Sequence, residues 1–326
     1  MKHIPVFLLV VIVLGFSNHL GAQSQYSCLF YNLENLFYPA DDPENEGDDA
    51  FTPEGERHWT WYRYRVKLSQ VSRILLCADG WDTPDIIGLC ELENRQVLLD
   101  LCNHPLLAGL ELEILHRDSP DHRGIDVGVL YRKDRVRCLD TAWIQIRDEN
   151  GRKIQTREII AATFLVESDT LLFAMNHWSS KFGGELESES GRMQQAETLG
   201  RYLDSIRLIH PGYHLVAGGD LNDNSASKPV KMLSEAFGLN EIIPDSEIAT
   251  YKYQGRWESI DHVFTDRQLA GIARAVIPEL DVLLCSDEKY TGHKPWRTYS
   301  GYAYQGGVSD HLPLLLRFEL PVCEDH

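Results

Sequence analysis

Six short segments of the chain concentrate residue types that can hold a hard cation and move protons. Each segment follows or ends a short apolar run, so its polar side chains fall where a strand would turn at the edge of a sheet. Carboxylates and amides offer the oxygen ligands that Mg²⁺ prefers, and histidine exchanges protons near neutral pH. The segments are residues 30–36, 88–94, 123–127, 176–181, 218–222, and the pair 259–262 with 309–311.

Acidic and amide residues in these segments predict a site for a metal ion and a phosphate. Glu91 ends the apolar run 85–90, which would deliver its carboxylate from a buried strand. Asp220 and Asn222 are two residues apart, so on an extended segment they point to the same side. Such a pair can orient a water molecule or hold a metal-bound phosphate. Asn32 supplies an amide at the end of another predicted strand.

Two histidines, His177 and His311, are the candidates for a general acid or base. A carboxylate behind a histidine fixes its tautomer and raises its pKa, and Asp261 and Asp310 are the candidates for this role. The partner of His177 stays open between two residues, Asp121 and Asp126.

Each of these residues has an ordinary structural explanation when it is taken singly. An asparagine after a strand is more often a turn residue, and an isolated histidine or glutamate is more often packed or exposed than catalytic. Trp178 is better explained by packing than by stacking on a substrate. The order of the six segments is therefore more informative than any one of them.

The elements that must position these residues are short, apolar and rich in β-formers, with helical patterns between them. Strands outnumber helices, and the runs 158–166 and 171–176 adjoin with no helix between them. The pattern therefore predicts an α/β fold of mixed or antiparallel sheets with helices outside, rather than a doubly wound parallel sheet. Strands are expected at 26–31, 85–90, 126–131, 158–166, 171–176, 213–218, 259–264 and 312–319, and helices at 62–78, 94–102, 191–209 and 228–237.

Length and charge limit the classes of function. The chain has 326 residues and 43% hydrophobic composition, enough for one large domain with its own core or for two small ones. It carries 31 Lys and Arg residues against 49 Asp and Glu residues. Generic binding to a polyanion is therefore not indicated, since phosphate contacts need cations. A local basic patch, or metal ions that invert the field, would still admit a phosphate ester.

The first 22 residues are typical of a secretory signal peptide. Lys2 precedes an apolar run over residues 4–16, and small residues precede Gln23. The run is shorter than the ~20 residues that span a bilayer, although an uncleaved anchor is the alternative. We expect cleavage near Ala22, a single catalytic domain over residues 23–326, and a secreted or periplasmic location.

Two further features carry less information. The seven cysteines are scattered without a C-x-x-C pair, which excludes a zinc framework but leaves one or two disulfides open. The acidic loop 41–49 could bind Ca²⁺, but its ligand spacing fits no named calcium loop. A solvated surface excursion is the favoured interpretation.

In their order, these motifs resemble the endonuclease/exonuclease/phosphatase family, which includes deoxyribonuclease-I-like nucleases, sphingomyelinases and inositol polyphosphate 5-phosphatases. Gly-Asp-Leu-Asn at 219–222 and Ser-Asp-His at 309–311 are the most diagnostic pieces, and the resemblance covers residues 27–318. The stretches 34–37 and 51–55 resemble the corresponding stretches of secreted bacterial members of this family. The resemblance implies a four-layer α/β/β/α sandwich of two packed mixed sheets flanked by helices, with the site at one rim.

The resemblance also implies a role for each motif residue. Mg²⁺, with Mn²⁺ as an alternative, would be held mainly by Glu91 with help from Asn32, and Asp310 would be a second metal ligand or an orienting carboxylate. Asp220 would orient or deprotonate the attacking water. The remaining catalytic residues would bind phosphate or transfer protons: Asn222, His177, and His311 supported by Asp261.

The expected substrate is a phosphodiester in nucleic acid, attacked in line by water without a covalent intermediate. Two loops, 250–257 and 289–304, interleave aromatic residues with cations, a pattern that can stack bases and contact backbone phosphates. Packing of these aromatic residues onto the rim is the alternative. A phosphatase or phospholipase-type phosphodiesterase is the enzymatic alternative, and a non-catalytic binding module is the second. No obligate protein partner is indicated, and a monomer is expected. The candidate substrate-binding residues are Arg123, Asn176, Lys181, Trp296 and Arg297.

Overall fold

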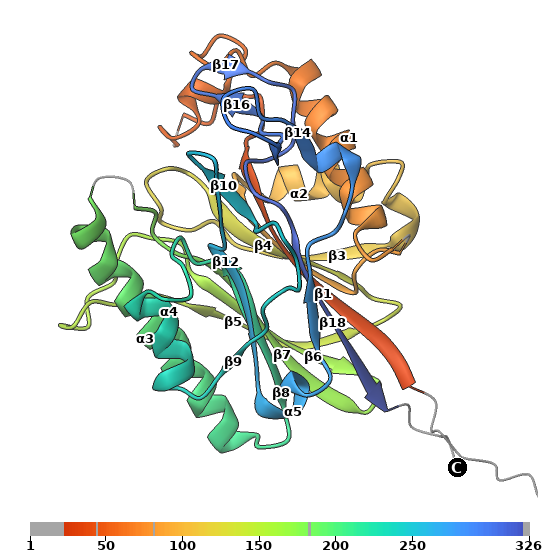
Figure 1. Ribbon diagram of the computed structural model, residues 1–326, viewed down its shortest axis with the longest axis vertical. Helices are drawn as coiled ribbons and strands as arrows, with labels where there is room; N and C mark the ends of the chain where they lie inside the picture. The colour runs from red at the N-terminus through yellow and green to blue at the C-terminus, as the bar shows by residue number, and fades with distance from the viewer. Residues whose placement is uncertain (1–22, 44, 81, 182–183, 322–326) are drawn as a thin grey trace, which may run out of the picture.

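Two six-stranded mixed sheets pack face to face, and helices cover the outer face of each sheet (Figure 1). The structure is a computed structural model that describes residues 23–321 except 44, 81, 182 and 183. The four-layer α/β/β/α sandwich expected from the sequence is confirmed. The proposed signal peptide, residues 1–22, lies outside the described residues.

The first sheet contains one parallel pair, β1 with β2, and its other neighbours are antiparallel. Helices α1 (Trp61–Cys77) and α2 (Arg95–Cys102) pack on its outer face. Its strands, in spatial order, are β13 (Arg274–Val276), β18 (Leu314–Pro321), β1 (Gln23–Leu36), β2 (Ile86–Leu92), β4 (Asp126–Arg132) and β3 (Leu112–His116).

The second sheet repeats this arrangement, with β7 and β8 as its parallel pair. Helices α3 (Glu185–Ile209) and α4 (Lys228–Glu235) cover its outer face, and the short α5 (Arg267–Ala270) follows β12. Its strands, in spatial order, are β5 (Arg137–Ile144), β6 (Ile159–Val166), β7 (Asp169–His177), β8 (His214–Asp220), β12 (Asp261–Thr265) and β9 (Asn240–Glu241).

Small hairpins and 3₁₀ turns complete the structure, and the hairpins gather at the end of the sandwich opposite the start of β1 and the end of β18 (Figure 1). The hairpins are β10 (Tyr251–Tyr253) with β11 (Arg256–Glu258), β14 (Leu284–Ser286) with β15 (His293–Pro295), and β16 (Tyr299–Ser300) with β17 (Ala303–Tyr304). The 3₁₀ turns are η1 (Asp49–Phe51), η2 (Ala108–Leu110) and η3 (Asp281–Leu283).

Alternation along the strands explains how the layers form. In β1, Cys28 and Phe30 face the second sheet, where the Phe30 ring stacks on Phe173 with centroids 4.9 Å apart. Leu29 and Tyr31 point the other way, toward α1 and α2. Because successive side chains of a strand alternate between its faces, an almost wholly apolar strand is buried on both sides.

The helices begin where the sequence provides caps. The Thr60 hydroxyl accepts the backbone N–H of Arg63 at the start of α1, and the Asn94 side chain accepts two N–H groups at the start of α2. No helix in the described part of the chain combines the length and apolarity needed to cross a membrane. The described cysteines, six of the seven, are all free thiols, so the optional disulfides are not found among them.

Candidate active site

One rim of the sandwich encloses a cavity of about 810 Å³ where strand ends from both sheets meet. The C-terminal ends of β1, β2, β7 and β8 reach this rim, and so do the start of β12 and the residues just before β18. The lining includes Glu34, Glu91, Arg123, Lys181, Asp220, Asn222, Tyr251, Tyr253, Arg297, Asp310 and His311.

Bulges in the first sheet turn two glutamates into the cavity. Strand pairing shifts register between Asn32 and Leu36 in β1, and between Cys90 and Leu92 in β2. The backbone is left-handed at Glu34, with φ 48°, and at Glu91, with φ 56°. Left-handed backbone is uncommon for residues other than glycine and is concentrated at functional sites. The local strain thus places two carboxylates at the same rim as Asn32.

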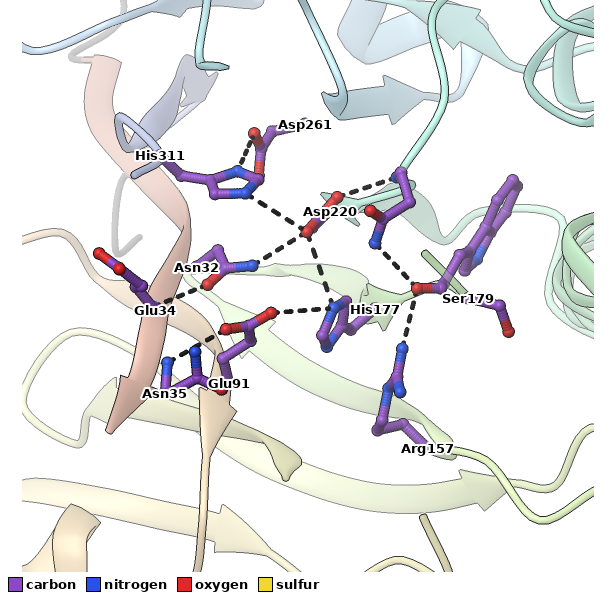
Figure 2. Close-up of polar contacts among 12 residues, drawn as sticks. Asn32, Glu34, Asn35, Glu91, Arg157, His177, Ser179, Asp220, Asp261 and His311 are labelled. Atoms are coloured by element: carbon purple, nitrogen blue, oxygen red, sulfur yellow. Dashed lines mark hydrogen bonds and ion pairs between the residues drawn. The ribbon is translucent and has the colours of Figure 1, made fainter. Parts of the chain in front are cut away.

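Asp220 lies at the centre of the polar network (Figure 2). Its carboxylate is 2% exposed, accepts the Asn32 amide at 2.9 Å and accepts the backbone N–H of Asn222 at 2.9 Å. The Nε2 atoms of His177 and His311 lie 3.7 and 3.8 Å from the same carboxylate oxygen. Burial raises the pKa of Asp220 to about 7, although the nearby His311 opposes the shift.

A glycine explains how the chain reaches this position. Gly219 precedes Asp220 with φ 129°, and a Cβ built there would lie 2.0 Å from the carbonyl oxygen of Asn176. Glycine is therefore required where β8 approaches β7 at the rim.

His311 and Asp261 form a buried pair. The Nδ1 atom of His311 lies 2.8 Å from the Asp261 carboxylate, which assigns the proton on Nδ1 and leaves Nε2 facing Asp220. Burial alone would lower the pKa of His311, but the carboxylates of Asp261 and Asp220 raise it well above its ordinary value. The structure thus places Asp261 behind His311, as the family resemblance implies.

His177 has no such support. Among the described residues, neither of its ring nitrogens has a hydrogen-bond partner, and Nε2 lies 3.8 Å from the Glu91 carboxylate. Burial, followed by the charge of Arg157, lowers the pKa of His177 well below its ordinary value. A buried imidazole without partners requires an explanation, and a bound ligand supplies one.

Neither candidate partner of His177 occupies that position. Asp121 forms a buried ion pair with Arg157 at 2.8 Å, and Asp126 contacts His116 at 3.0 Å. Arg157 also donates to the backbone carbonyl of Trp178. Through Arg157, Asp121 therefore holds the backbone next to His177, and neither aspartate supports the His177 ring.

Two predicted metal ligands have other contacts. The Asn32 amide nitrogen donates to Asp220, and its oxygen accepts the backbone N–H of Glu34 at 2.8 Å, so Asn32 positions Asp220. Asp310 pairs with Arg297 at 2.8 Å. Glu91 remains the best-placed carboxylate, with the backbone N–H of Asn35 at 3.1 Å and the Arg123 guanidinium at 3.6 Å.

Sequence reasoning missed Glu34 and the buried Lys67. Glu34 lines the cavity and accepts the backbone N–H groups of Thr298 and Tyr299, and burial raises its pKa to about 7. The Lys67 ammonium donates to the Glu34 carbonyl and to the Thr298 hydroxyl. Glu34 follows Asn32 by two residues, so the spacing argument that joined Asp220 with Asn222 could have found it. Lys67 gave no signal, because it lies in an ordinary helical pattern.

Two predicted substrate-binding residues, Asn176 and Trp296, are not among the residues that line the cavity. Asn176 is 0% exposed, and its amide donates to the carbonyls of Ala174 and Gly218 inside the sheet. Trp296 lies outside the described lining of the cavity, with its indole N–H donating to the Gln305 carbonyl at 3.0 Å.

The three predicted cations Arg123, Lys181 and Arg297 do line the cavity. Each also has a carboxylate within ion-pair distance: Glu91 for Arg123, Asp223 for Lys181 and Asp310 for Arg297. The ion pairs therefore hold the three cationic groups at defined positions on the cavity wall.

A model of the endonuclease/exonuclease/phosphatase family matches residues 27–320 of this chain. The chain belongs to this family. Its members are phosphoesterase hydrolases that generally use divalent metal ions. No curated protein matches the sequence.

Solved structures share the fold at low sequence identity. The human Nocturnin catalytic domain with bound sulfate anion is 15% identical over 92% of this chain and 96% of that chain, with a TM-score of 0.58. An endonuclease/exonuclease/phosphatase from Bacteroides vulgatus is 16% identical over 91% and 99%, with a TM-score of 0.58. Truncated TDP2 from Caenorhabditis elegans is 15% identical over 91% and 98%, with a TM-score of 0.56.

The residues of this chain fit a divalent cation. Glu91 and Glu34 place carboxylates on the cavity wall. His177 Nε2, which has no hydrogen-bond partner among the described residues, lies 3.8 Å from the Glu91 carboxylate. Mg²⁺ in particular needs one or two carboxylates together with waters and substrate phosphate, so it does not need a complete cage of protein ligands.

Proposed function

We propose that this protein is a secreted, Mg²⁺-dependent phosphodiesterase that cleaves nucleic acid. The observation that carries the proposal is the position of Asp220 between two histidines, hydrogen-bonded by Asn32 and Asn222, at the wall of a cavity that also exposes Glu91. A buried carboxylate, two proton carriers and a metal ligand are what hydrolysis of a phosphate ester requires.

The protein side chains divide the reaction between them. When bound at Glu91, Mg²⁺ would neutralise charge on the phosphoryl oxygens and on the leaving alkoxide. Asp220 would orient the attacking water and accept its proton. His311, kept cationic by Asp261, would donate a hydrogen bond to the phosphate. His177, whose ring nitrogens have no hydrogen-bond partner among the described residues, would form a hydrogen bond with the same phosphate. The bound sulfate named for Nocturnin supports an anion site in this fold.

Nucleic acid is the favoured substrate because the cavity combines cations with aromatic rings. Arg57, Arg123, Lys181 and Arg297 lie on its walls. The Tyr253 ring is 54% exposed at the mouth, where a base could stack on it. Stacking on aromatic side chains together with backbone contacts is how single-stranded nucleic acids are held.

A compact phosphate ester, from a lipid or an inositol phosphate, is the second candidate. The same cavity is lined by the carboxylates of Glu34, Glu91, Glu258 and Asp310 as well as Asp220, which disfavours a long polyanion. Protein-wide charge of −18 points the same way.

An activity panel separates these candidates. Purified protein would be assayed with Mg²⁺, with Mn²⁺ and with EDTA on plasmid DNA, RNA, a chromogenic phosphodiester, a phosphomonoester and sphingomyelin. We expect cleavage of DNA or RNA that EDTA abolishes and that weakens steeply with added salt. Cleavage of the small diester or of sphingomyelin without nuclease activity would replace nucleic acid by the second candidate.

Export is tested separately. The mature, exported protein should begin near Gln23, because the small residues before it fit a signal-peptidase site. Mass spectrometry that finds Met1 on the exported chain would instead indicate an uncleaved anchor.

A further inference from the structure

A second group of carboxylates lies outside the catalytic centre, in the loop over residues 41–49. Carboxylate oxygens of Asp41, Asp48 and Asp49 all lie within 4.8 Å of one another. Among the described residues, no lysine, arginine or histidine forms an ion pair with any of the three. Three acidic side chains held this close repel one another, and a bound cation would relieve the repulsion.

Asp48 gives the independent evidence for a ligand. Its side chain is 0% exposed, and one carboxylate oxygen accepts the backbone N–H of Asp42 at 2.8 Å. The other oxygen, Oδ1, is buried and has no hydrogen-bond partner among the described residues. Burying an unpaired carboxylate oxygen carries a large desolvation cost, so such atoms are paired or coordinate metals.

A second buried carboxylate, that of Glu93, lies next to Asp48. Glu93 is 5% exposed and accepts the backbone N–H of Tyr38 at 2.6 Å, and the side chains of Asn45 and Asp48 lie within hydrogen-bonding reach of it. Glu93 therefore adds a further acidic side chain beside Asp48.

We propose that the 41–49 loop binds a Ca²⁺ ion through Asp41, Asp48 and Asp49, with Asp48 as its buried ligand. Oxygen donors from a short irregular loop suit Ca²⁺, which accepts 6–8 ligands in flexible geometry. Mg²⁺ demands near-ideal octahedral geometry and gives up its waters reluctantly, so it suits this loop less well.

The ion would also hold the turn that carries Arg123. A Cβ built on Gly47 would lie 2.2 Å from the carbonyl oxygen of Arg123, and one built on Gly124 would lie 2.0 Å from the Asn45 side chain. The loop and the 121–124 turn are therefore in direct contact. Fixing the loop should restrain the turn, and with it a cation that lines the cavity.

Calcium binding is tested on chelator-treated protein by titration calorimetry with CaCl₂. We expect Asp48→Asn, and separately the exposed pair Asp41→Asn with Asp49→Asn, to weaken one binding event about tenfold or more. Glu91→Gln should keep that event, which separates it from any ion bound at the catalytic centre. Glu54→Gln, an exposed acidic residue of the adjoining segment, is the matched control and should bind as wild type does.

Two further measurements do not depend on catalysis. Ca²⁺ at 100 times its dissociation constant should raise the melting temperature by about 5 °C, while the same concentration of Mg²⁺ should not reproduce this in Glu91→Gln. Hydrogen exchange over residues 121–124 should slow on Ca²⁺ addition. Unchanged calcium binding in the exposed pair variant, which keeps the buried Asp48, would overturn the proposal, as would equal protection by Mg²⁺ in Glu91→Gln.

Discussion

The two walls of the cavity are built differently. We call the inner wall the buried polar residues at the strand ends: Asp220 and His311, which line the cavity, and Asn32, His177 and Asp261, which lie against them. All five are at most 6% exposed. Buried hydrogen bonds connect Asn32 to Asp220 and Asp261 to His311. The positions of these side chains are therefore set by strand pairing within the two six-stranded sheets and by the packing of one sheet on the other.

The outer wall consists of Arg57, Tyr251, Tyr253, Arg297 and Tyr299, which lie on loops and two-stranded hairpins. Its contacts are mixed: Arg297 pairs with Asp310 at 2.8 Å and the Arg57 guanidinium lies over the Tyr299 ring at 5.2 Å, but the Tyr253 ring is half exposed. The contrast suggests that the sheets fix the chemistry while the hairpins select the substrate.

The largest effect is expected from Glu91→Gln. Removing the charge that holds the metal should reduce kcat/KM by about three orders of magnitude or more, with the circular dichroism spectrum unchanged. Glu258→Gln is the control, because Glu258 lines the same cavity from a hairpin and should lose little. If Glu91→Gln kept more than half of the wild-type activity at saturating Mg²⁺, the metal assignment would be wrong.

The inner wall should behave as a unit. His177→Ala and His311→Ala should each lose about 10²- to 10⁴-fold in kcat, and the double variant should lose little more, because residues that act together are not additive. His210→Ala, an exposed residue after α3, controls for general loss of a histidine. Fully multiplicative losses in the double variant would show that the two histidines act independently.

The inner wall could be predicted from the sequence because its residues adjoin apolar runs. Asn32, His177 and Asp220 lie in or at the end of the runs that form β1, β7 and β8, and Asp261 and His311 come at or just before the runs that form β12 and β18. Once a residue was placed beside a predicted strand, its chemical type was enough to indicate its role. The spacing did not show the bulges at Glu34 and Glu91, because a register shift depends on the partner strand. The edge strands β3 and β5 were missed because their partly exposed residues lack a long apolar run.

The outer wall could not be predicted in detail. Trp296 and Tyr253 carry the same signal in the sequence, an aromatic residue among cations, yet one braces its loop and the other faces the cavity. Asn176 likewise stands beside His177, and alternation turns it into the sheet. Which aromatic residue faces the substrate depends on long-range contacts of the loops, such as the bond from Arg57 to the Gly301 carbonyl.

A moderate effect is expected from Tyr253→Ala. If bases stack on this ring, KM for single-stranded DNA or RNA should rise about fivefold to a hundredfold, since stacking contributes ~1–3 kcal/mol per base. A small chromogenic diester should be cleaved as before. Tyr302→Ala is the control, because Tyr302 is 65% exposed and lies outside the described lining. Equal KM values for DNA in the two variants would argue against the outer wall as the nucleic-acid surface.

Trp296→Ala tests the other half of that comparison. We expect a lower melting temperature by a few degrees, because the indole hydrogen bond to Gln305 and its packing are lost, with KM for DNA changed less than twofold. A rise in KM as large as that of Tyr253→Ala, without loss of stability, would restore Trp296 to the substrate surface.

The smallest effect concerns the stability of the chelated protein against pH. Burial raises the pKa of Asp220 and of Glu34 to about 7, and that of Glu93 to about 8. A raised pKa contributes stability below the unfolded value that is lost as the pH rises through the folded value. His177, with its lowered pKa, acts in the opposite direction, but its contribution is complete by about pH 6.5, the ordinary histidine value.

Between pH 6.5 and 8 the carboxylates and His311, whose pKa Asp261 and Asp220 raise well above its ordinary value, act in the same direction and decide the sign. Lys67, whose pKa burial lowers to about 8, adds stability mainly above this window. In EDTA the melting temperature should fall by about 3 °C from pH 6.5 to 8, and Mg²⁺ should reduce the decline by offsetting the ionised carboxylates. Glu34→Gln should make the decline shallower, because it removes one of the groups that titrate in this window. A melting temperature that rose across this window in EDTA would mean that Asp220 is not held against ionisation in the inner wall, and the contrast between the two walls would lose its electrostatic basis.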